Sequence, residues 1–206
     1  MRRLLIFLKY PTPGKVKTRL AASVGDQAAS DMYRACTEVT LERLAVLCEN
    51  SILCVDPPDA IDATRAWLGD QWTIRAQQGR TLGERLAHAI GEVFADGAQR
   101  VVTIGTDSPW LTAANIEEAF ESLRASDVVI GPTEDGGYYL IGLSRSIPAL
   151  FDGIAWSTSA VYQETINTAR TLGLRIHTLP SGYDIDRPED LQRFRSETSA
   201  SQSAIT

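Results

Sequence analysis

Short apolar runs alternate along this chain with longer segments of helical periodicity, and this alternation limits the fold more than any other feature. It is typical of the α/β class, in which helices pack on both faces of a mostly parallel sheet. Gly69, Gly97 and Gly173 stand where three of the expected helices should end. Strands are expected at residues 3–8, 51–55, 72–76, 100–104, 127–130 and 174–178, and helices at residues 26–48, 60–68, 82–95, 113–124, 158–172 and 188–196.

One apolar run breaks this alternation. Residues 138–143 form a further β-like segment, which follows Gly136 and Gly137 with no helix in between. We therefore expect an added antiparallel strand beside the main sheet.

The chain shows no internal repeat and no linker, so residues 1–195 are predicted to form one domain. Pro188 suits the first turn of the last expected helix. The end of the chain, residues 196–206, is rich in Ser, Thr and Ala and has little to bury. That composition predicts a disordered tail.

Charge limits the classes of partner. The 206 residues carry a formal net charge of −6, and the pI is near 5.0. With no basic face beyond the first loop, a nucleic acid or an anionic membrane is an unsuitable partner, and a small anionic ligand fits better.

No apolar stretch approaches the ~20 residues that span a bilayer, and the apolar run 4–8 is too short for a signal peptide. Three cysteines without metal-ligand spacing suit a reducing compartment, so we expect a cytoplasmic protein.

The loop after the first expected strand concentrates positive charge. It reads PTPGKVKTRL from residue 11 and delivers three cations to the start of a helix. In α/β proteins, ligands collect beyond the carboxyl ends of the strands, and a helix N-terminus there favours anions. The loop is therefore predicted to bind phosphates, although many basic loops are only solvated. The candidate residues are Pro13, Gly14, Lys17, Thr18 and Arg19.

A second candidate follows the strand at residues 100–104. Asp107 comes directly after this strand, where a carboxylate can hold Mg²⁺ or Mn²⁺ against a diphosphate. The alternative is that Asp107 caps the helix near Thr112 or stabilises its own turn. The motif alone leaves both roles open.

Two further acids, Asp184 and Asp186, precede the last expected helix. Their side chains project to the same side if the segment is extended. One of them could share a metal ion with Asp107, while the other orients a neighbour. Equally, Asp186 could be only the N-cap of the helix that begins at Pro188.

A glycine-rich loop, Asp135-Gly136-Gly137-Tyr138, combines an acid with close backbone approach and an aromatic ring. This combination is typical of sugar-binding loops, although a plain turn would also need the glycines. A second loop, whose sequence signal is weaker, contains Gly79 and Arg80, which could accept a ribose or a phosphate. Among the tryptophans, Trp110 and Trp156 are the candidates for stacking on a base or a sugar.

Five segments carry a combined signal: the run from Lys9 to Leu20, Gly105-Thr106-Asp107-Ser108-Pro109, Asp135-Gly136-Gly137-Tyr138-Tyr139, Trp156-Ser157-Thr158 and Asp184-Ile185-Asp186-Arg187-Pro188-Glu189-Asp190-Leu191. Together they resemble a bacterial family, the DUF2064 proteins, also called selenodomain-associated transferase 1. These are GT-A-type glycosyltransferase-like proteins of the nucleotide-diphospho-sugar transferase superfamily. The resemblance spans residue 4 to about residue 195.

The resemblance implies a three-layer α/β/α, Rossmann-like GT-A fold and a divalent metal, Mg²⁺ or Mn²⁺. By analogy with the superfamily, Asp107 would be one metal ligand and Asp186 the second, with Asp184 beside it. Lys17 and Arg19 would lie near phosphates.

The same resemblance implies a metal-dependent transferase with a nucleotide-activated donor, most simply a glycosyltransferase acting from a nucleotide sugar. Catalysis would rest on Asp107 and Lys17, which stabilise charge on the leaving group, and on Asp135, which positions or deprotonates an acceptor hydroxyl. The substrate wall would comprise Gly136, Gly137, Tyr138 and Trp156.

Departures from the superfamily keep other functions open. The glycine-rich opening of sugar-nucleotide pyrophosphorylases is absent, and the loop in its place resembles that of guanylyltransferases acting on phospholactate. A nucleotidyltransferase that releases pyrophosphate is therefore an alternative. A nucleotide-sugar-binding protein without turnover is a third interpretation, although three acids facing a polyanion argue against it.

Overall fold

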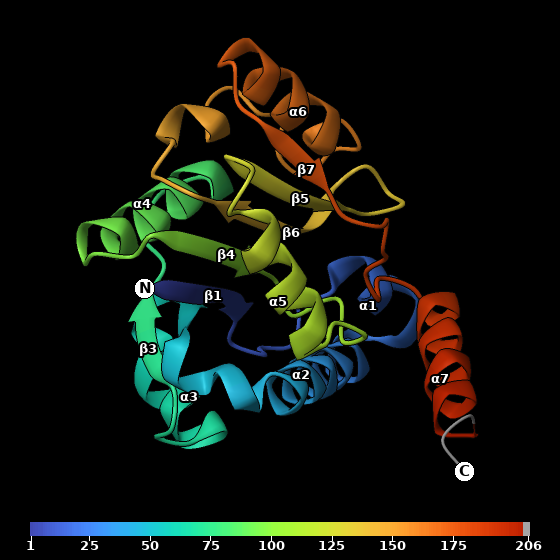
Figure 1. Ribbon diagram of the computed structural model, residues 1–206. Coiled ribbons are helices and arrows are strands. Elements are labelled where there is room, and N and C mark those ends of the chain that lie inside the picture. Colours follow the sequence, from blue (N-terminus) through green and yellow to red (C-terminus); the bar gives the residue numbers. More distant parts are fainter. Residues whose placement is uncertain (204–206) are drawn as a thin grey trace.

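Seven strands form one sheet with helices on both faces, within residues 1–203 that the computed structural model describes (Figure 1). Side chains are described up to residue 197. The α/β class predicted from the alternating apolar runs is confirmed. The strands are β1 (Arg2–Lys9), β2 (Ser51–Asp56), β3 (Thr73–Ala76), β4 (Arg100–Ile104), β5 (Val128–Pro132), β6 (Tyr138–Leu143) and β7 (Ile176–Thr178).

Helices and short 3-10 turns connect most of these strands. In the described part of the chain, no helix has both the length and the apolar character that a bilayer span needs. The helices are α1 (Thr18–Val24), α2 (Asp26–Arg43), α3 (Ile61–Leu68), α4 (Leu82–Ala95), α5 (Ala113–Ser122), α6 (Val161–Thr171) and α7 (Pro188–Ser203), and the 3-10 turns are η1 (Ala45–Asn50), η2 (Pro58–Ala60) and η3 (Pro148–Phe151).

The strand order is β3-β2-β1-β4-β6-β5-β7. β1 pairs in parallel with β2 and β4, β2 with β3, and β5 with β7. β6 runs antiparallel to both of its neighbours, which confirms the added antiparallel strand. The physical reason is the short connection from β5, residues 133–137, because parallel neighbours need a crossover of about a dozen residues.

The central strand β1 is apolar throughout because both faces of the sheet are covered. Leu4 and Ile6 belong to the core that α2 and α5 cover, whereas Leu5 belongs to the core under α4 and α6. Alternate side chains of one strand therefore enter two separate cores. The carboxyl ends of the parallel neighbours β1 and β4 lie side by side at one end of the sheet.

The helix boundaries differ from the prediction most clearly in three places. Residues 18–24 form a helix of their own, α1, and Gly25 in the left-handed region (φ 85°) separates it from α2. The α-helix predicted to reach residue 48 ends at Arg43, because Leu44 turns into the core and the chain continues as η1. At the other end, α7 continues past residue 196 to Ser203, since neither Gly nor Pro interrupts this segment. Residues 204–206 of the predicted tail lie outside the described residues.

Asp127, just before β5, should make stability depend on pH in the acid range. Its Oδ2 accepts hydrogen bonds from the backbone N–H and the Nε of Arg175, and its Oδ1 accepts one from Arg145. These contacts, led by the backbone hydrogen bond, lower the pKa of Asp127 to about 2, below the ~3.9 of an unfolded chain. The stabilisation is complete above pH ~4 and is lost as the pH falls toward 2.

We expect Asp127→Asn to lower the free energy of unfolding by about 1–2 kcal/mol at neutral pH and to flatten its decline between pH 4 and 2. Urea unfolding across this range measures the effect. Asp70→Asn, at a side chain that is 86% exposed, is the control. An unchanged acid profile in Asp127→Asn would contradict the assignment.

Candidate active site

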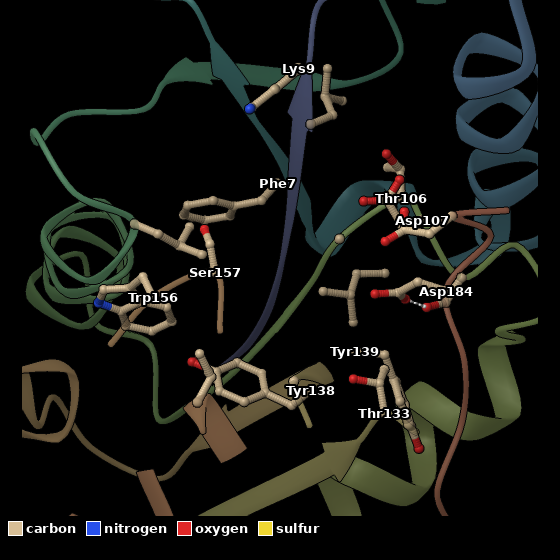
Figure 2. Close-up of a pocket in the computed structure, with 18 of the residues that line it drawn as sticks. Phe7, Lys9, Thr106, Asp107, Thr133, Tyr138, Tyr139, Trp156, Ser157 and Asp184 are labelled. Carbon is tan, nitrogen blue, oxygen red and sulfur yellow. Dashed lines mark hydrogen bonds between the residues drawn. The ribbon is translucent and has the colours of Figure 1, made fainter. Parts of the chain in front are cut away.

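The carboxyl ends of β1 and β4 border a cavity of about 880 Å³. Its walls also include the loop after β1, the start of α4, the segment before α6 and the chain that leads into α7 (Figure 2). Ligands of open α/β sheets bind at this edge, and sites for small molecules measure ~300–1,000 Å³. The cavity therefore has the place and the size of a small-molecule site.

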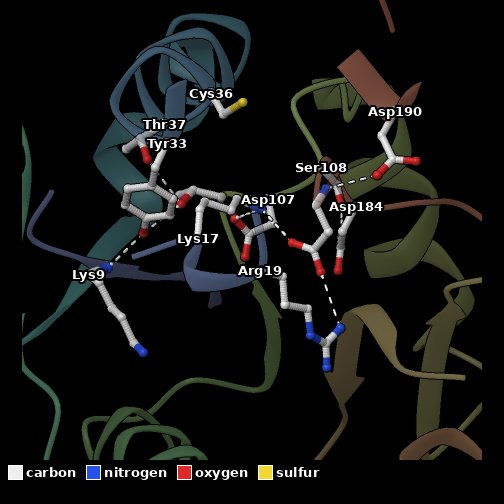
Figure 3. A network of polar contacts seen from close by, with 12 residues as sticks. Lys9, Lys17, Arg19, Tyr33, Cys36, Thr37, Asp107, Ser108, Asp184 and Asp190 are labelled. Carbon is white, nitrogen blue, oxygen red and sulfur yellow. Dashed lines mark hydrogen bonds and ion pairs between the residues drawn. The ribbon is translucent and has the colours of Figure 1, made fainter. Parts of the chain in front are cut away.

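Lys17 provides a buried positive charge in the wall of this cavity. Its Nζ lies 2.6 Å from Asp107 Oδ1 and 2.9 Å from Asp186 Oδ1, and only 4% of the side chain is exposed (Figure 3). Burial alone would lower the pKa of Lys17, but the two carboxylates raise it above its ordinary value. The ammonium is therefore charged at neutral pH and offsets part of the negative charge of the two acids.

The backbone of Lys17 is strained. It caps the N-terminus of α1 with φ 47° and ψ 44°, in the left-handed region that costs an L-residue ~1–2 kcal/mol. Arg19, two residues later, lies 3.7 Å from Asp186 Oδ2, but 68% of its side chain is exposed. Of these two cations, only Lys17 is enclosed between the carboxylates.

Asp107 belongs to the cavity and not to a helix cap. The cap of α5 is Thr112, whose side chain accepts a hydrogen bond from the backbone N–H of Asn115 in a capping box. The Oδ1 atom of Asp107 is buried, and the Lys17 ammonium lies 2.6 Å from it. A buried carboxylate oxygen needs such a positive partner to offset its charge.

The two roles considered for Asp186 are also separated by the structure. The carboxylate at the start of α7 is that of Asp190, which accepts hydrogen bonds from the backbone N–H groups of Asp186 and Arg187 at 3.0 and 2.8 Å. The side chain of Asp186 reaches Lys17 instead. The N-cap role that the sequence offered for Asp186 is not the one its side chain takes; instead the carboxylate of Asp190, inside the first turn of α7, reaches back to the N–H groups just before the helix.

Asp184 lies beside this cluster. Its Oδ1 accepts a hydrogen bond from the hydroxyl of Ser108 at 2.5 Å. Burial, followed by the charge of Asp107, raises the pKa of Asp184 to about 7, while the Ser108 hydroxyl opposes the shift. Asp184 therefore stands in a site that disfavours a further negative charge, chiefly because the site is buried.

The three acids predicted as metal ligands do not form a metal-binding group as they stand. Among the described residues, no set of three or more His, Cys, Asp or Glu side chains could hold an ion. In this arrangement the Lys17 ammonium lies between Asp107 and Asp186, and Asp184 accepts a hydrogen bond from Ser108.

Tyr33, on α2, holds together the two strand ends that carry the cluster. Its hydroxyl accepts hydrogen bonds from the backbone N–H of Lys9 and from Thr106, and so connects the ends of β1 and β4 (Figure 3). Burial and the charge of Asp107 raise the pKa of Tyr33 to about 12, which keeps the hydroxyl neutral. Sequence analysis missed this residue because a tyrosine within a helical pattern carries no local signal of a role at a strand end.

The glycine-rich loop between β5 and β6 packs against the segment before α6. Asp135 Oδ1 accepts hydrogen bonds from the Thr133 hydroxyl and the Gly137 N–H, at 2.6 and 3.1 Å. Gly136 has φ 90°, and a Cβ there would lie 2.1 Å from the backbone oxygen of Ser159. Gly136 thus permits close approach to the protein's own backbone, whereas Asp135 and Gly137 line the cavity.

The loop after β3 contributes differently from its prediction. Gln77 is buried, and its side-chain amide donates to the carbonyls of Leu8 and Cys54. Arg80 lines the cavity, but Gly79 does not. A Cβ on Gly79 would lie 2.8 Å from the backbone nitrogen of Arg85, so this glycine serves the turn.

An aromatic wall faces the acidic cluster across the cavity (Figure 2). It consists of Phe7, Tyr138 and Trp156, with the last two rings in edge contact at 6.4 Å between centroids. The hydroxyl of Tyr138 is buried without a hydrogen-bond partner. Trp110, the other stacking candidate, instead packs between Tyr139 and Tyr183 as part of the fold.

The structure gathers most of the predicted site around one cavity. The cavity-lining residues that were predicted are Lys17, Thr18, Arg19, Arg80, Asp107, Asp135, Gly137, Tyr138, Trp156, Asp184 and Asp186. Pro13, Gly14, Gly79 and Gly136 are not among the lining residues. Lining residues that the sequence analysis missed are Tyr33, Gln77, Arg85, Ser108 and Ser157, of which Ser108 and Ser157 stand inside motifs already singled out.

Comparisons with known proteins agree with this architecture. The model of a family described as an uncharacterized protein conserved in bacteria (DUF2064) matches residues 40–158. A solved protein from Desulfovibrio desulfuricans G20, provisionally assigned as a nucleotide-diphospho-sugar transferase, is 42% identical. The match covers 90% of this chain and 82% of that one, with a TM-score of 0.85. Among curated proteins, none matches the chain.

Two more distant structures share the fold. A CMP:2-keto-3-deoxy-manno-octonic acid synthetase complexed with CTP is 14% identical over 97% of this chain and 99% of its own, with a TM-score of 0.61. The protein Rv0371c from Mycobacterium tuberculosis H37Rv, in complex with manganese, is 16% identical over 94% and 97%, with a TM-score of 0.55.

Proposed function

Because this chain belongs to the DUF2064 family, we propose that it is a transferase that uses a nucleotide-activated donor, with glycosyl transfer from a nucleotide sugar as its first candidate reaction. The observation that carries the proposal is the convergence of Asp107, Asp186 and Lys17 at the carboxyl ends of β1 and β4, in the wall of the cavity. A polyphosphate binds where backbone, cations and carboxylate-held metal meet at this edge of an α/β sheet. The relative that is 42% identical supports the same class.

The acidic cluster fits a divalent cation in its chemistry. Asp107 Oδ1 is buried, and it shares the Lys17 ammonium with Asp186 Oδ1. Mg²⁺ and Mn²⁺ prefer such hard oxygen ligands. Asp107 and Asp186 would hold the ion, with Asp184 beside them, and the ion would offset charge on the departing diphosphate or pyrophosphate.

The remaining groups act on the two substrates. Lys17 and Arg19 attract and orient the phosphates, an electrostatic contribution that is strong in an enclosed site. Tyr138 and Trp156 offer flat apolar faces to a sugar ring or an acceptor. Asp135 positions the acceptor hydroxyl and takes its proton.

Nucleotidyl transfer is the second candidate. Its support is the buried Lys17 on the loop after β1, since a departing pyrophosphate needs a cation at that place. The two reactions differ in product, because glycosyl transfer releases a nucleoside diphosphate and nucleotidyl transfer releases pyrophosphate.

A thermal-shift panel followed by product analysis tests the proposal. With Mn²⁺ present, a ligand at ~100 times its dissociation constant stabilises by about 2.7 kcal/mol. Stabilisation by one nucleoside diphosphate and its sugar conjugate, with release of that diphosphate, would support glycosyl transfer. A response to one nucleoside triphosphate with pyrophosphate release would support the second candidate. Binding without turnover in any pairing would leave a binding protein, and no response to any nucleotide would refute the proposal.

Asp135→Asn tests the role of the proposed base. We expect the rate at saturating acceptor to fall by ~10²–10⁴, because the amide cannot accept the proton. The asparagine keeps the Oδ1 acceptor that Thr133 and Gly137 use, so the loop should stay in place. The matched control is Glu134→Gln, at the adjacent exposed residue that pairs with Arg193. If Asp135→Asn and the control show equal rates, Asp135 is not the base.

A further inference from the structure

Lys17 already occupies the point where the proposed metal ion would bind. Its ammonium stands within 2.6 and 2.9 Å of one oxygen each from Asp107 and Asp186. These are the two carboxylate oxygens that share the Lys17 ammonium, and Asp107 Oδ1 is buried. An ammonium and a divalent cation cannot both fill one site between two carboxylates.

We propose that Lys17 is a built-in counterion, which holds the metal position in the ligand-free protein and is displaced onto the polyphosphate when the metal–nucleotide complex binds. This inference rests on the proposed function, because it presupposes a metal and a nucleotide at this site. It goes further in two respects. Lys17 pairs first with the two carboxylates and then with the polyphosphate, and the binding of the metal and the binding of the nucleotide strengthen each other.

The local geometry allows such an exchange. The Lys17 carbonyl accepts a hydrogen bond from the N–H of Ala21, which ties the backbone to the start of α1, while the lysine side chain is a flexible four-carbon stem that can swing its charge without moving the loop. The ammonium lines the cavity, so the phosphates of a bound nucleotide would lie within its reach. Arg19 cannot replace Lys17 between the two carboxylates, because its side chain is mostly exposed and approaches only Asp186, at Oδ2.

The exchange predicts a low affinity of the protein for a metal ion in the absence of nucleotide. A metal ion that arrives alone would push a buried ammonium away from both of its carboxylates and offer it no anion in return, which is costly. A nucleotide supplies that anion. The protein should therefore bind Mn²⁺ weakly by itself and more tightly together with a nucleotide.

Replacing Lys17 with methionine tests this directly, with Mn²⁺ alone as the probe and electron paramagnetic resonance of the free ion as the readout. Without nucleotide, Lys17→Met should bind Mn²⁺ roughly 10–100-fold more tightly than the unaltered protein, in the range of typical couplings between sites. Lys15→Met is the matched control: it removes the same charge from the same loop, and Lys15 makes no ion pair with Asp107 or Asp186 among the described residues. It should change Mn²⁺ affinity less than about threefold. Equal affinities in Lys17→Met and the unaltered protein would overturn the inference.

Thermal unfolding with and without Mn²⁺ guards against a folding defect. If Lys17→Met loses its cooperative transition in metal-free buffer, saturating Mn²⁺ should restore it, because the ion replaces the missing charge. A variant that stays unfolded with Mn²⁺ would show that an ion cannot replace the lysine, which also overturns the inference.

The same titrations separate this inference from the proposed function. If the unaltered protein binds Mn²⁺ and nucleotide together but Lys17→Met gains no affinity for Mn²⁺, the counterion role fails and the transferase remains. If Lys17→Met gains affinity but no nucleotide binds to the unaltered protein, the counterion role stands and the proposed function fails.

Discussion

Asp107→Asn should lower turnover by about 10²–10³-fold while the protein remains folded. Asp107 follows β4 at the edge of the cavity, and its carboxylate holds the buried Lys17 ammonium at 2.6 Å. The amide has nearly the same shape but carries no charge. It can neither bind a divalent ion strongly nor balance Lys17, so charge on the leaving group would lose its support.

The measurement is the steady-state rate with the donor that the panel identifies, together with a thermal melt to show that the fold persists. Asp70→Asn removes the same charge at a side chain that is 86% exposed and pairs only loosely with Arg65, at 3.7 Å. That control should keep its rate within about twofold. A near-normal rate in Asp107→Asn would remove Asp107 from the mechanism.

Gly136→Ala should lower the free energy of unfolding by about 3 kcal/mol or more. Two costs add at this residue. The backbone is in the left-handed region at φ 90°, and the new methyl group would lie 2.1 Å from the carbonyl oxygen of Ser159. Moving the two backbone segments apart to relieve this contact would cost free energy, because the Gly136 carbonyl also accepts a hydrogen bond from the N–H of Tyr162.

Gly97→Ala separates these two costs. Gly97 has the same φ of 90°, but no atom lies within 4 Å of the position that its new methyl group would take. This control should therefore lose only the conformational part, about 1–2 kcal/mol. Urea unfolding of both variants gives the difference. If the two losses are equal, the loop does not pack against Ser159 as the structure describes.

Gly136→Ala should also affect the cavity. The loop carries Asp135, Gly137 and Tyr138 into the cavity wall, and its contact with Ser159 joins it to the segment that carries Trp156. Displacing one segment from the other would change two walls at once. Donor or acceptor affinity should therefore fall in this variant even at temperatures where it remains folded.

The fold was largely predictable from local patterns. Apolar runs of strand length indicated the sheet, and the absence of a helix before residues 138–143 indicated the antiparallel strand. The helix ends were less predictable. The α-helix ends at Arg43, and the next residue, Leu44, is fully buried by partners that lie far away along the chain.

The candidate site was predictable in its chemistry but not in its contacts. A carboxylate after a strand and cations in the first loop are signals within a few residues, so Asp107, Lys17 and Arg19 were found. The start of α7 illustrates the limit: both Asp186 and Asp190 are suitable by type as acceptors for the N–H groups there, and only the geometry gives that role to Asp190 and leaves Asp186 to Lys17. Tyr33 had no local signal at all, because its role depends on the meeting of α2 with the ends of β1 and β4.

The sequence by itself therefore determined the α/β class, the added strand and the residue types that collect at the strand ends. These follow from periodicity and from the order of elements, which are local properties. Only the tertiary structure decided that the Lys17 ammonium stands between Asp107 and Asp186, that Asp184 bonds to Ser108, and that Trp110 packs in the fold while Trp156 lines the cavity. The physical reason is that such contacts join residues far apart in the chain, and their distances and electrostatic energies exist only once the sheet has brought those segments together.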